Sequence, residues 1–164
     1  MNNNFKESYI KWLYENIDEY RISKNVFRLT LPYLDRNNDC IEIFIKIDGD
    51  SCTLTDDGET INELELSNFN IFSSQWRIDI FNQILKSHGV SRSDKNELFV
   101  MCSESDLPQR KHMLSQCMIK VSDLFYTSRN TIQSLFIEDV QSYLDSADIR
   151  YTPNISFPGR SNLP

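Results

Sequence analysis

The fold is decided by a stretch that reads Ile41-Glu42-Ile43-Phe44-Ile45-Lys46-Ile47-Asp48-Gly49-Asp50-Ser51-Cys52-Thr53-Leu54-Thr55. Isoleucine occupies every second position of the first half, and this alternation predicts a strand with one buried face. Asp48-Gly49 is a signal for a two-residue hairpin loop. A loop at these two residues pairs Ile45 with Cys52, which puts the apolar residues of the second strand on the isoleucine face.

Helices and strands are expected on both sides of this hairpin. Apolar residues at helical spacing predict a helix over residues 4–20, and alternation predicts a strand over residues 27–31 that stops at Pro32. Residues 60–63 have capping-box spacing, which predicts a short helical turn. The later expected elements are a helix closed by Gly89, a strand over residues 98–102, a helix begun by Asp106 and Pro108, a helix containing Phe136, and an edge strand over residues 149–157.

This order of elements predicts an α+β fold. An N-terminal helix precedes a three-stranded antiparallel meander, and helices and a further strand pack with it on one sheet. The order also fits the core of the restriction-endonuclease-like class. We expect residues 1–128 to form this domain, and residues 129–164 to be a helix and an edge strand that begin a second, truncated domain.

The negative charge of the chain is local. The 164 residues carry a formal net charge of −7. Between Asp35 and Glu65 there are ten acidic residues and two basic ones, so this stretch carries −8 and the remainder +1. A domain that binds nucleic acid through phosphates normally presents a net basic face, so this class is disfavoured.

Other patterns bear on localisation. No apolar run approaches the roughly 18 residues of a membrane span, and no signal-peptide core follows the N-terminus. The four cysteines are widely spaced, without the C-x-x-C pattern of zinc ribbons and redox motifs. We therefore expect a cytoplasmic protein with reduced thiols and no membrane contact.

Three segments resemble one known family. They are residues 27–36, residues 39–47, and the run Leu54-Thr55-Asp56-Asp57-Gly58-Glu59-Thr60-Ile61, of which the first five residues are the most specific. Together they are similar to the bacterial and prophage-associated domain of unknown function 1828, and residues 149–161 resemble the start of the domain that follows it in longer members. The resemblance implies no catalytic residues, but it implies a bacterial or phage cytosolic setting and a role in phage–host conflict.

Calcium binding is one chemistry that the acidic stretch suggests. The run Asp35-Arg36-Asn37-Asn38-Asp39 matches the opening of an EF-hand loop. That loop then requires a glycine and a final glutamate, where this chain has Cys40 and Lys46. We expect the carboxylates of Asp35 and Asp39 to hydrogen-bond their own turn instead, and we expect no metal site and no cofactor.

A degenerate or incomplete metal-dependent nuclease is the alternative. Such chemistry requires a carboxylate near the second strand and Glu-x-Lys on the third, so that carboxylates hold Mg²⁺ and lysine steadies the transition state. Asp39 and Glu42 are the candidate carboxylates, and Lys46 lies four residues after Glu42. The third strand contains neither Glu nor Lys. A weaker alternative is a nucleic-acid-binding module that uses Arg92, Lys95, Arg110 and Lys111.

The first interpretation is a non-catalytic interaction or regulatory domain of a prophage or mobile element. Its partner would be a protein with a basic surface, because complementary charge gives steering and specificity. Asp-Asp-Gly at residues 56–58 also has an ordinary interpretation as a turn, and the oligomeric state stays open. The predicted binding surface consists of Asp35, Asp48, Asp50, Asp56, Asp57 and Glu59.

Overall fold

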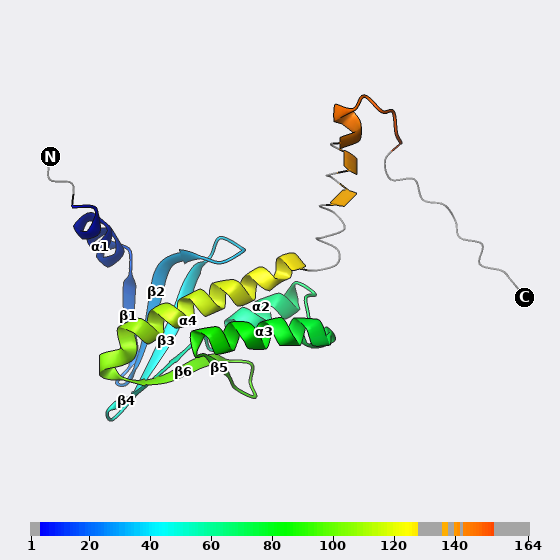
Figure 1. The fold of residues 1–164 in the computed structure, drawn as a ribbon. Helices are drawn as coiled ribbons and strands as arrows, with labels where there is room; N and C mark the ends of the chain where they lie inside the picture. Colours follow the sequence, from blue (N-terminus) through cyan, green and yellow to red (C-terminus); the bar gives the residue numbers. More distant parts are fainter. Residues whose placement is uncertain (1–3, 128–135, 138–139, 142, 153–164) are drawn as a thin grey trace, which may run out of the picture. The chain divides into compact units, whose positions relative to one another are not determined.

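The computed structural model describes residues 4–127, 136–137, 140–141 and 143–152. The chain divides into two units, Met1–Phe125 and Tyr126–Pro164, and the first contains the labelled helices and strands (Figure 1). In the second unit, residues 136–137, 140–141 and 143–146 are helical. The edge strand expected over residues 149–157 lies largely outside the described residues, and residues 149–152 are not in a strand.

The first unit is α+β, which confirms the predicted fold class. Its helices are α1 (Phe5–Glu15), α2 (Glu59–Leu66), α3 (Gln75–His88) and α4 (Leu107–Ser122), with short 3-10 turns at Ile71–Ser73, Glu104–Asp106 and Asp123–Thr127. Its strands are β1 (Asp18–Ser23), β2 (Val26–Leu34), β3 (Cys40–Asp48), β4 (Ser51–Thr55), β5 (Ser91–Arg92) and β6 (Leu98–Ser103). They form one antiparallel sheet in the order β1-β2-β3-β4-β6-β5.

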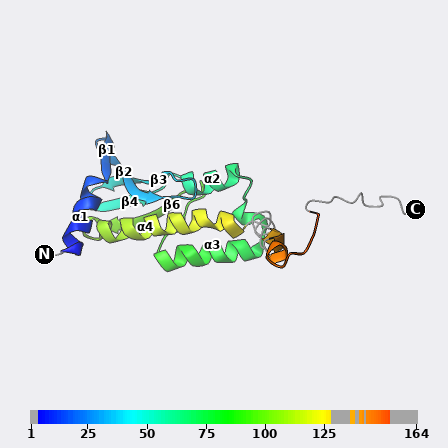
Figure 2. The same ribbon diagram turned by 90° about the horizontal axis from the view of Figure 1, so that it is seen from above.

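Helices cover one face of this sheet. Helix α4 lies on the sheet and α3 lies beside α4, as the view from above shows (Figure 2). The isoleucine face of β3 points toward these helices. Ile43 is fully buried in one hydrophobic core with Leu54 of β4 and with Leu114 and Val121 of α4. No helix within the described ranges has the length and apolarity needed to span a bilayer.

The predicted hairpin forms, but its register differs by two residues. Ile45 lies opposite Leu54 and Ile47 opposite Cys52, so the loop is Gly49-Asp50 and not Asp48-Gly49. Gly49 takes a φ of 57° at the first loop position, which glycine adopts without strain. A shift of two residues keeps every side chain on its expected face, so the buried face was predicted correctly.

The helix expected over residues 4–20 is wrong over its last five residues. Helix α1 ends at Glu15, where the side-chain amide of Asn16 donates to the Trp12 carbonyl at 2.8 Å, and Asp18–Ser23 forms the edge strand β1. Every residue of β1 is exposed, so the strand has no buried face to impose an apolar alternation. The two-residue strand β5 was likewise not predicted.

Pro32 does not end its strand, contrary to expectation. Strand β2 continues to Leu34, and its pairing with β3 is irregular between Thr30 and Leu34. Strand β1 pairs with β2 only as far as Thr30. The missing N–H of Pro32 therefore falls where no regular ladder needs a donor.

Candidate functional site

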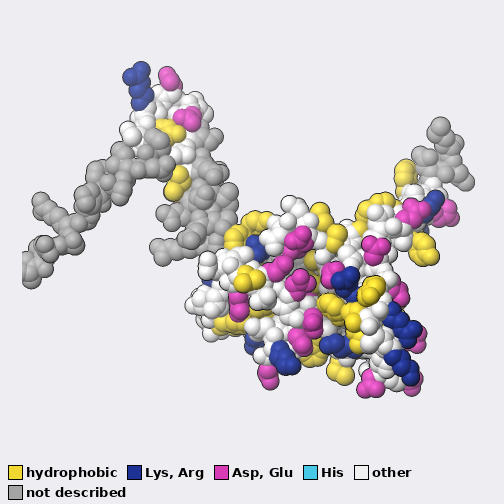
Figure 3. All heavy atoms as spheres, turned by 180° about the vertical axis from the view of Figure 1, so that it is seen from behind, with side chains coloured by type: hydrophobic (Ala, Val, Ile, Leu, Met, Phe, Trp, Pro, Cys, Tyr) yellow, Lys and Arg dark blue, Asp and Glu magenta, His cyan; other side chains and the backbone are white. Residues whose placement is uncertain are grey.

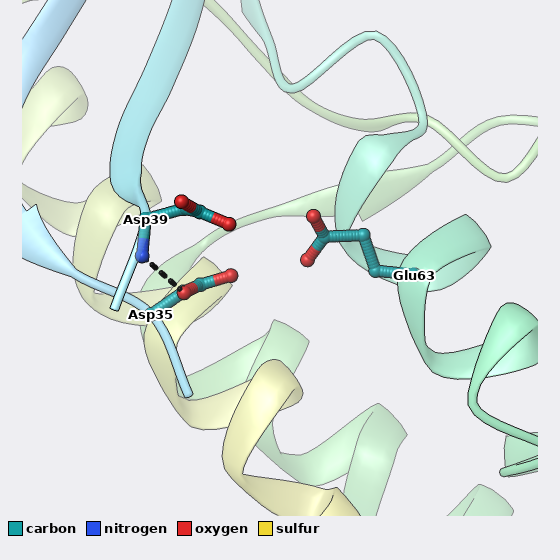
Figure 4. A group of neighbouring side chains, drawn as sticks. All are labelled: Asp35, Asp39 and Glu63. Atoms are coloured by element: carbon teal, nitrogen blue, oxygen red, sulfur yellow. Dashed lines mark hydrogen bonds between the residues drawn. The ribbon is translucent and has the colours of Figure 1, made fainter. Parts of the chain in front are cut away.

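The turn between β2 and β3 is organised by the carboxylate of Asp35. Its Oδ1 accepts hydrogen bonds from the backbone N–H groups of Asn37 at 2.8 Å and Asp39 at 2.9 Å. Asn38 completes the turn with a φ of 64°. The expectation that a carboxylate hydrogen-bonds its own turn is confirmed for Asp35 and is wrong for Asp39, which contributes its backbone N–H and not its carboxylate. The second carboxylate oxygen of Asp35 is left facing away from the turn, toward α2 (Figure 4).

Helix α2 is positioned by Asp56, which is fully buried. Its Oδ1 accepts from the N–H groups of Gly58 at 2.9 Å and Leu98 at 2.7 Å, and its Oδ2 accepts from that of Thr60 at 3.2 Å. Burial raises the pKa of Asp56, and these hydrogen bonds act in the opposite direction. The predicted capping box does not form, because the helix N-cap is Gly58, at a φ of 86°, without a side-chain cap.

Three carboxylates meet where the β2–β3 turn faces α2. Oxygen atoms of Asp35, Asp39 and Glu63 all lie within 4.8 Å of one another, and the three side chains point toward one another (Figure 4). They line a small cavity with a volume of about 30 Å³. The further lining residues include Glu42 of β3, Glu59 and Thr60 of α2, and Met118 and Ser122 of α4.

Burial and repulsion between neighbouring carboxylates raise the pKa values of glutamates in this cavity. The pKa of Glu63 is raised to about 7, first by burial and then by a hydrogen bond and repulsion from Asp35 and repulsion from Glu59. The pKa of Glu59 is also raised, by burial and by surrounding carboxylates, of which Glu42 acts most strongly. A cation placed among these groups would therefore lower the free energy of their charged forms.

Arg36 lies near these carboxylates but forms no ion pair with them among the described residues. Arg36 Nη2 donates to the backbone carbonyl of Glu63 at 3.1 Å and to Ser67 Oγ at 2.7 Å. Its guanidinium lies over the Phe125 ring, 4.4 Å from the centroid. Arg36 thus fixes the end of α2 on the sheet, and its charge only partly offsets the carboxylates.

An open groove of about 510 Å³ adjoins the cavity and shares Glu42 and Glu59 with it. Asp57 and Glu65 add two more carboxylates to its wall, and Lys95 stands among them. Cavity and groove together form what we call the acidic face, whose solvent-accessible carboxylates are those of Asp35, Asp39, Glu42, Asp57, Glu59, Glu63 and Glu65. Asp56 also borders the groove, but its side chain is fully buried. The side of the sheet turned away from α3 and α4 carries both acidic and basic side chains (Figure 3).

The structure separates the six residues of the predicted binding surface. Asp35, Asp57 and Glu59 belong to the acidic face. Asp48 and Asp50 lie at the β3–β4 hairpin, at the opposite end of β3 from Asp39. Asp56 borders the groove but is fully buried, and its carboxylate accepts hydrogen bonds from backbone N–H groups.

The nuclease candidates are also divided. Asp39 and Glu42 line the same cavity. Lys46 Nζ lies 3.9 Å from Asp57 Oδ1, and Glu42 is engaged by Arg28 at 3.6 Å and by the Thr30 hydroxyl at 3.2 Å. This arrangement pairs the lysine with another carboxylate. It contains no Glu-x-Lys on β4.

Two polar residues of the cavity, Glu63 and Ser122, were not predicted from the sequence. Glu63 follows Glu59 by four residues and so shares its helix face, a spacing that could have identified it. Ser122 lies far along the chain on α4, and no local pattern marks it. Both enter the site through tertiary packing of α2 between the β2–β3 turn and α4.

A family model described as Domain of unknown function DUF1828 matches residues 31–121, which is more than half of the chain. The protein belongs to the DUF1828 family. The DUF1828 match includes Asp35, Asp39 and Glu63 and ends one residue before Ser122. No curated protein and no solved structure matches this DUF1828 chain, so its function has to be argued from the geometry of its own residues.

Proposed function

We propose that this DUF1828 protein is a non-catalytic interaction domain, and that its acidic face binds a basic surface of another protein. One observation carries the proposal. Among the described residues, five of the seven carboxylates of the acidic face have no ion-pair partner, namely Asp35, Asp39, Glu59, Glu63 and Glu65. Carboxylates without an ion-pair partner in the cavity and the adjoining groove favour binding of a positively charged partner.

The proposal differs from the expectation based on sequence in where the partner binds. The acidic stretch was expected to act as one surface, but Asp48 and Asp50 lie at the far end of β3, roughly 30 Å along the strand from Asp39 at ~3.3 Å per residue. The binding surface that we propose runs along the exposed side of α2. It therefore includes Glu63 and Glu65 and omits Asp56.

We also propose a cellular setting for the protein. The family resemblance supports a cytoplasmic protein of a prophage or mobile element that acts in phage–host conflict. The genes that neighbour its coding sequence test this part: phage or defence genes would support it, and housekeeping neighbours in independent genomes would contradict it.

A pair of charge-matched variants tests the binding surface. Glu59→Gln combined with Glu65→Gln removes two charges from the acidic face, and Asp48→Asn combined with Asp50→Asn removes two charges from the hairpin. We expect the first pair to weaken binding of a lysine- and arginine-rich peptide about tenfold in an anisotropy titration, and the second to leave it nearly unchanged. Raising the salt concentration should weaken the wild-type complex.

Equal effects of the two pairs would mean that only net charge matters and would contradict a specific surface. Affinity capture from bacterial lysate with the same variants extends the test to natural partners. A protein that is retained by the hairpin pair and lost with the α2 pair is the expected result. Retention of duplex DNA in place of a protein would contradict the proposal and support a nucleic-acid-binding module.

A further inference from the structure

The cavity beneath the β2–β3 turn has the size of an ion site. Its volume of about 30 Å³ suits one ion or one water molecule. Asp35, Asp39 and Glu63 present oxygen atoms to one another within 4.8 Å, from two different elements of the fold (Figure 4). The side chains of Asp39 and Asp35 approach from the turn, and that of Glu63 approaches from α2 (Figure 4).

A buried hydroxyl in the same cavity gives an independent indication of a ligand. Ser122 lines the cavity from α4 and is only 3% exposed. Its Oγ has no hydrogen-bond partner among the described residues. Buried hydroxyl groups are normally hydrogen-bonded or bound to an ordered ligand, so this one requires an explanation.

Hydrogen bonds within the β2–β3 turn also fix the orientation of the Asp35 carboxylate. Asp35 Oδ1 is occupied by the N–H groups of Asn37 and Asp39, so the carboxylate is fixed with its other oxygen toward Glu63 (Figure 4). The carboxylate of Asp39 makes no hydrogen bond or ion pair within the described part of the chain. Removing it should therefore leave the fold intact.

We propose that Asp35, Asp39 and Glu63 bind one hard divalent cation of the Ca²⁺ and Mg²⁺ class, with the Ser122 hydroxyl contacting the cation or a water bound to it. Carboxylate and hydroxyl oxygens are the ligands that these cations prefer, and three carboxylates leave positions for water. The cation would offset the repulsion that raises the pKa of Glu63. This site goes beyond the proposed interaction function and shares Asp35, Asp39 and Glu63 with the acidic face, whereas the peptide test changes Glu59 and Glu65, so the two proposals can fail separately.

Calorimetric titration of the full chain, freed of metal by a chelator, tests the site with CaCl₂, MgCl₂ and ZnCl₂ separately. We expect saturable binding of one Ca²⁺ or Mg²⁺ per chain. Asp39→Asn and Glu63→Gln should each weaken it about tenfold or more, and Ser122→Ala should weaken it by a smaller factor. Asp48→Asn with Asp50→Asn is the control, and its affinity should stay within about twofold of wild type because the hairpin lies remote from the cavity.

Three results would overturn the inference. They are the absence of saturable Ca²⁺ or Mg²⁺ binding, equal loss in the hairpin control, and binding of Zn²⁺ alone. Circular dichroism and thermal unfolding of each variant distinguish a lost site from a lost fold, and Asp39→Asn keeps the test sharp because that carboxylate has no structural partner. Peptide binding that survives in chelator while metal binding fails would leave the interaction function standing by itself.

Discussion

The carboxylate of Asp56 accepts a hydrogen bond from the backbone N–H of Leu98 at 2.7 Å, across 42 positions of sequence. The same carboxylate accepts from Gly58 and Thr60 at the start of α2. A single buried side chain thus joins β4, α2 and β6, and it holds α2 where the acidic face requires it. This role explains the first aspartate of the Asp-Asp-Gly motif, Asp56, as a structural residue.

Removing the Asp56 carboxylate should therefore destabilise the whole unit. We expect Asp56→Ala to lower the free energy of unfolding by about 2–4 kcal/mol, because three backbone donors lose their acceptor in a buried site. Asp56→Asn should cost less, since its remaining oxygen can still accept from Gly58 and Leu98. Urea unfolding measures both. Asp57→Asn is the control, because Asp57 is exposed and asparagine tolerates its φ of 55°.

Crowding at Glu63 predicts a pH dependence of stability in the metal-free protein. Its pKa is about 7 in the folded chain against 4.5 as an isolated group, so the folded chain keeps a proton that the unfolded chain releases between these values. The contribution of Glu63 to the free energy of unfolding is full below pH 4.5 and is lost as the pH rises through 7. Of the charged groups that face Glu63, Asp35 and Glu59 raise its pKa and Arg36 lowers it. Asp39 lies in the same cluster.

Glu63→Gln removes this penalty. In chelator at a pH above 7 the variant should be more stable than wild type by about 1 kcal/mol, a value reduced for the partial exposure of the side chain. Below pH 4.5 the two proteins should unfold alike. Thermal unfolding across this range measures the difference, and a variant that is less stable than wild type at high pH would show that the Glu63 carboxylate is not under repulsion.

The buried face of the sheet was predictable because the isoleucines of β3 repeat with the period of a strand. The register was not, because Asp48-Gly49 and Gly49-Asp50 are both acceptable loops by composition, and the choice depends on which residue takes a positive φ. Strand β1 escaped prediction because an exposed edge strand is held by backbone hydrogen bonds, which leave no apolar pattern. An apolar alternation reveals a strand only where one face of that strand is buried.

The candidate site was predictable only in its local parts. Asp35 and Asp39 share one turn, so their proximity follows from adjacency in sequence. Glu63 reaches them only because Asp56 and Arg36 place α2 beside the turn, and Ser122 reaches them only because α4 packs beneath. The predicted acidic surface included the buried Asp56 together with exposed acidic residues. Composition alone does not show which carboxylates accept hydrogen bonds from the backbone.

Thiol chemistry gives a further check on burial. Cys40 is exposed, whereas Cys117 is fully buried and its thiol pKa is raised to about 12, chiefly by desolvation. At pH near 8 the thiolate fraction of Cys117 is then of order 10⁻⁴, so it should react with a disulfide reagent only when the chain unfolds. Cys40→Ser should abolish the fastest phase of labelling. Rapid labelling of Cys117 in the native protein would contradict the packing of α4 on the sheet.

The observed hairpin register leads to a prediction at Gly49, whose φ is 57°. Gly49→Ala should destabilise the protein by about 1 kcal/mol, because an alanine side chain is strained in this left-handed conformation. Nothing lies within 4 Å of the position that a Cβ would occupy, so the cost comes from backbone conformation and not from a clash. Gly49→Asn should cost less, since asparagine adopts this conformation more readily. Equal thermal stability of Gly49→Ala and wild type would contradict the positive φ of Gly49. A nuclear Overhauser contact between the paired residues Ile47 and Cys52 would verify the Gly49-Asp50 loop directly.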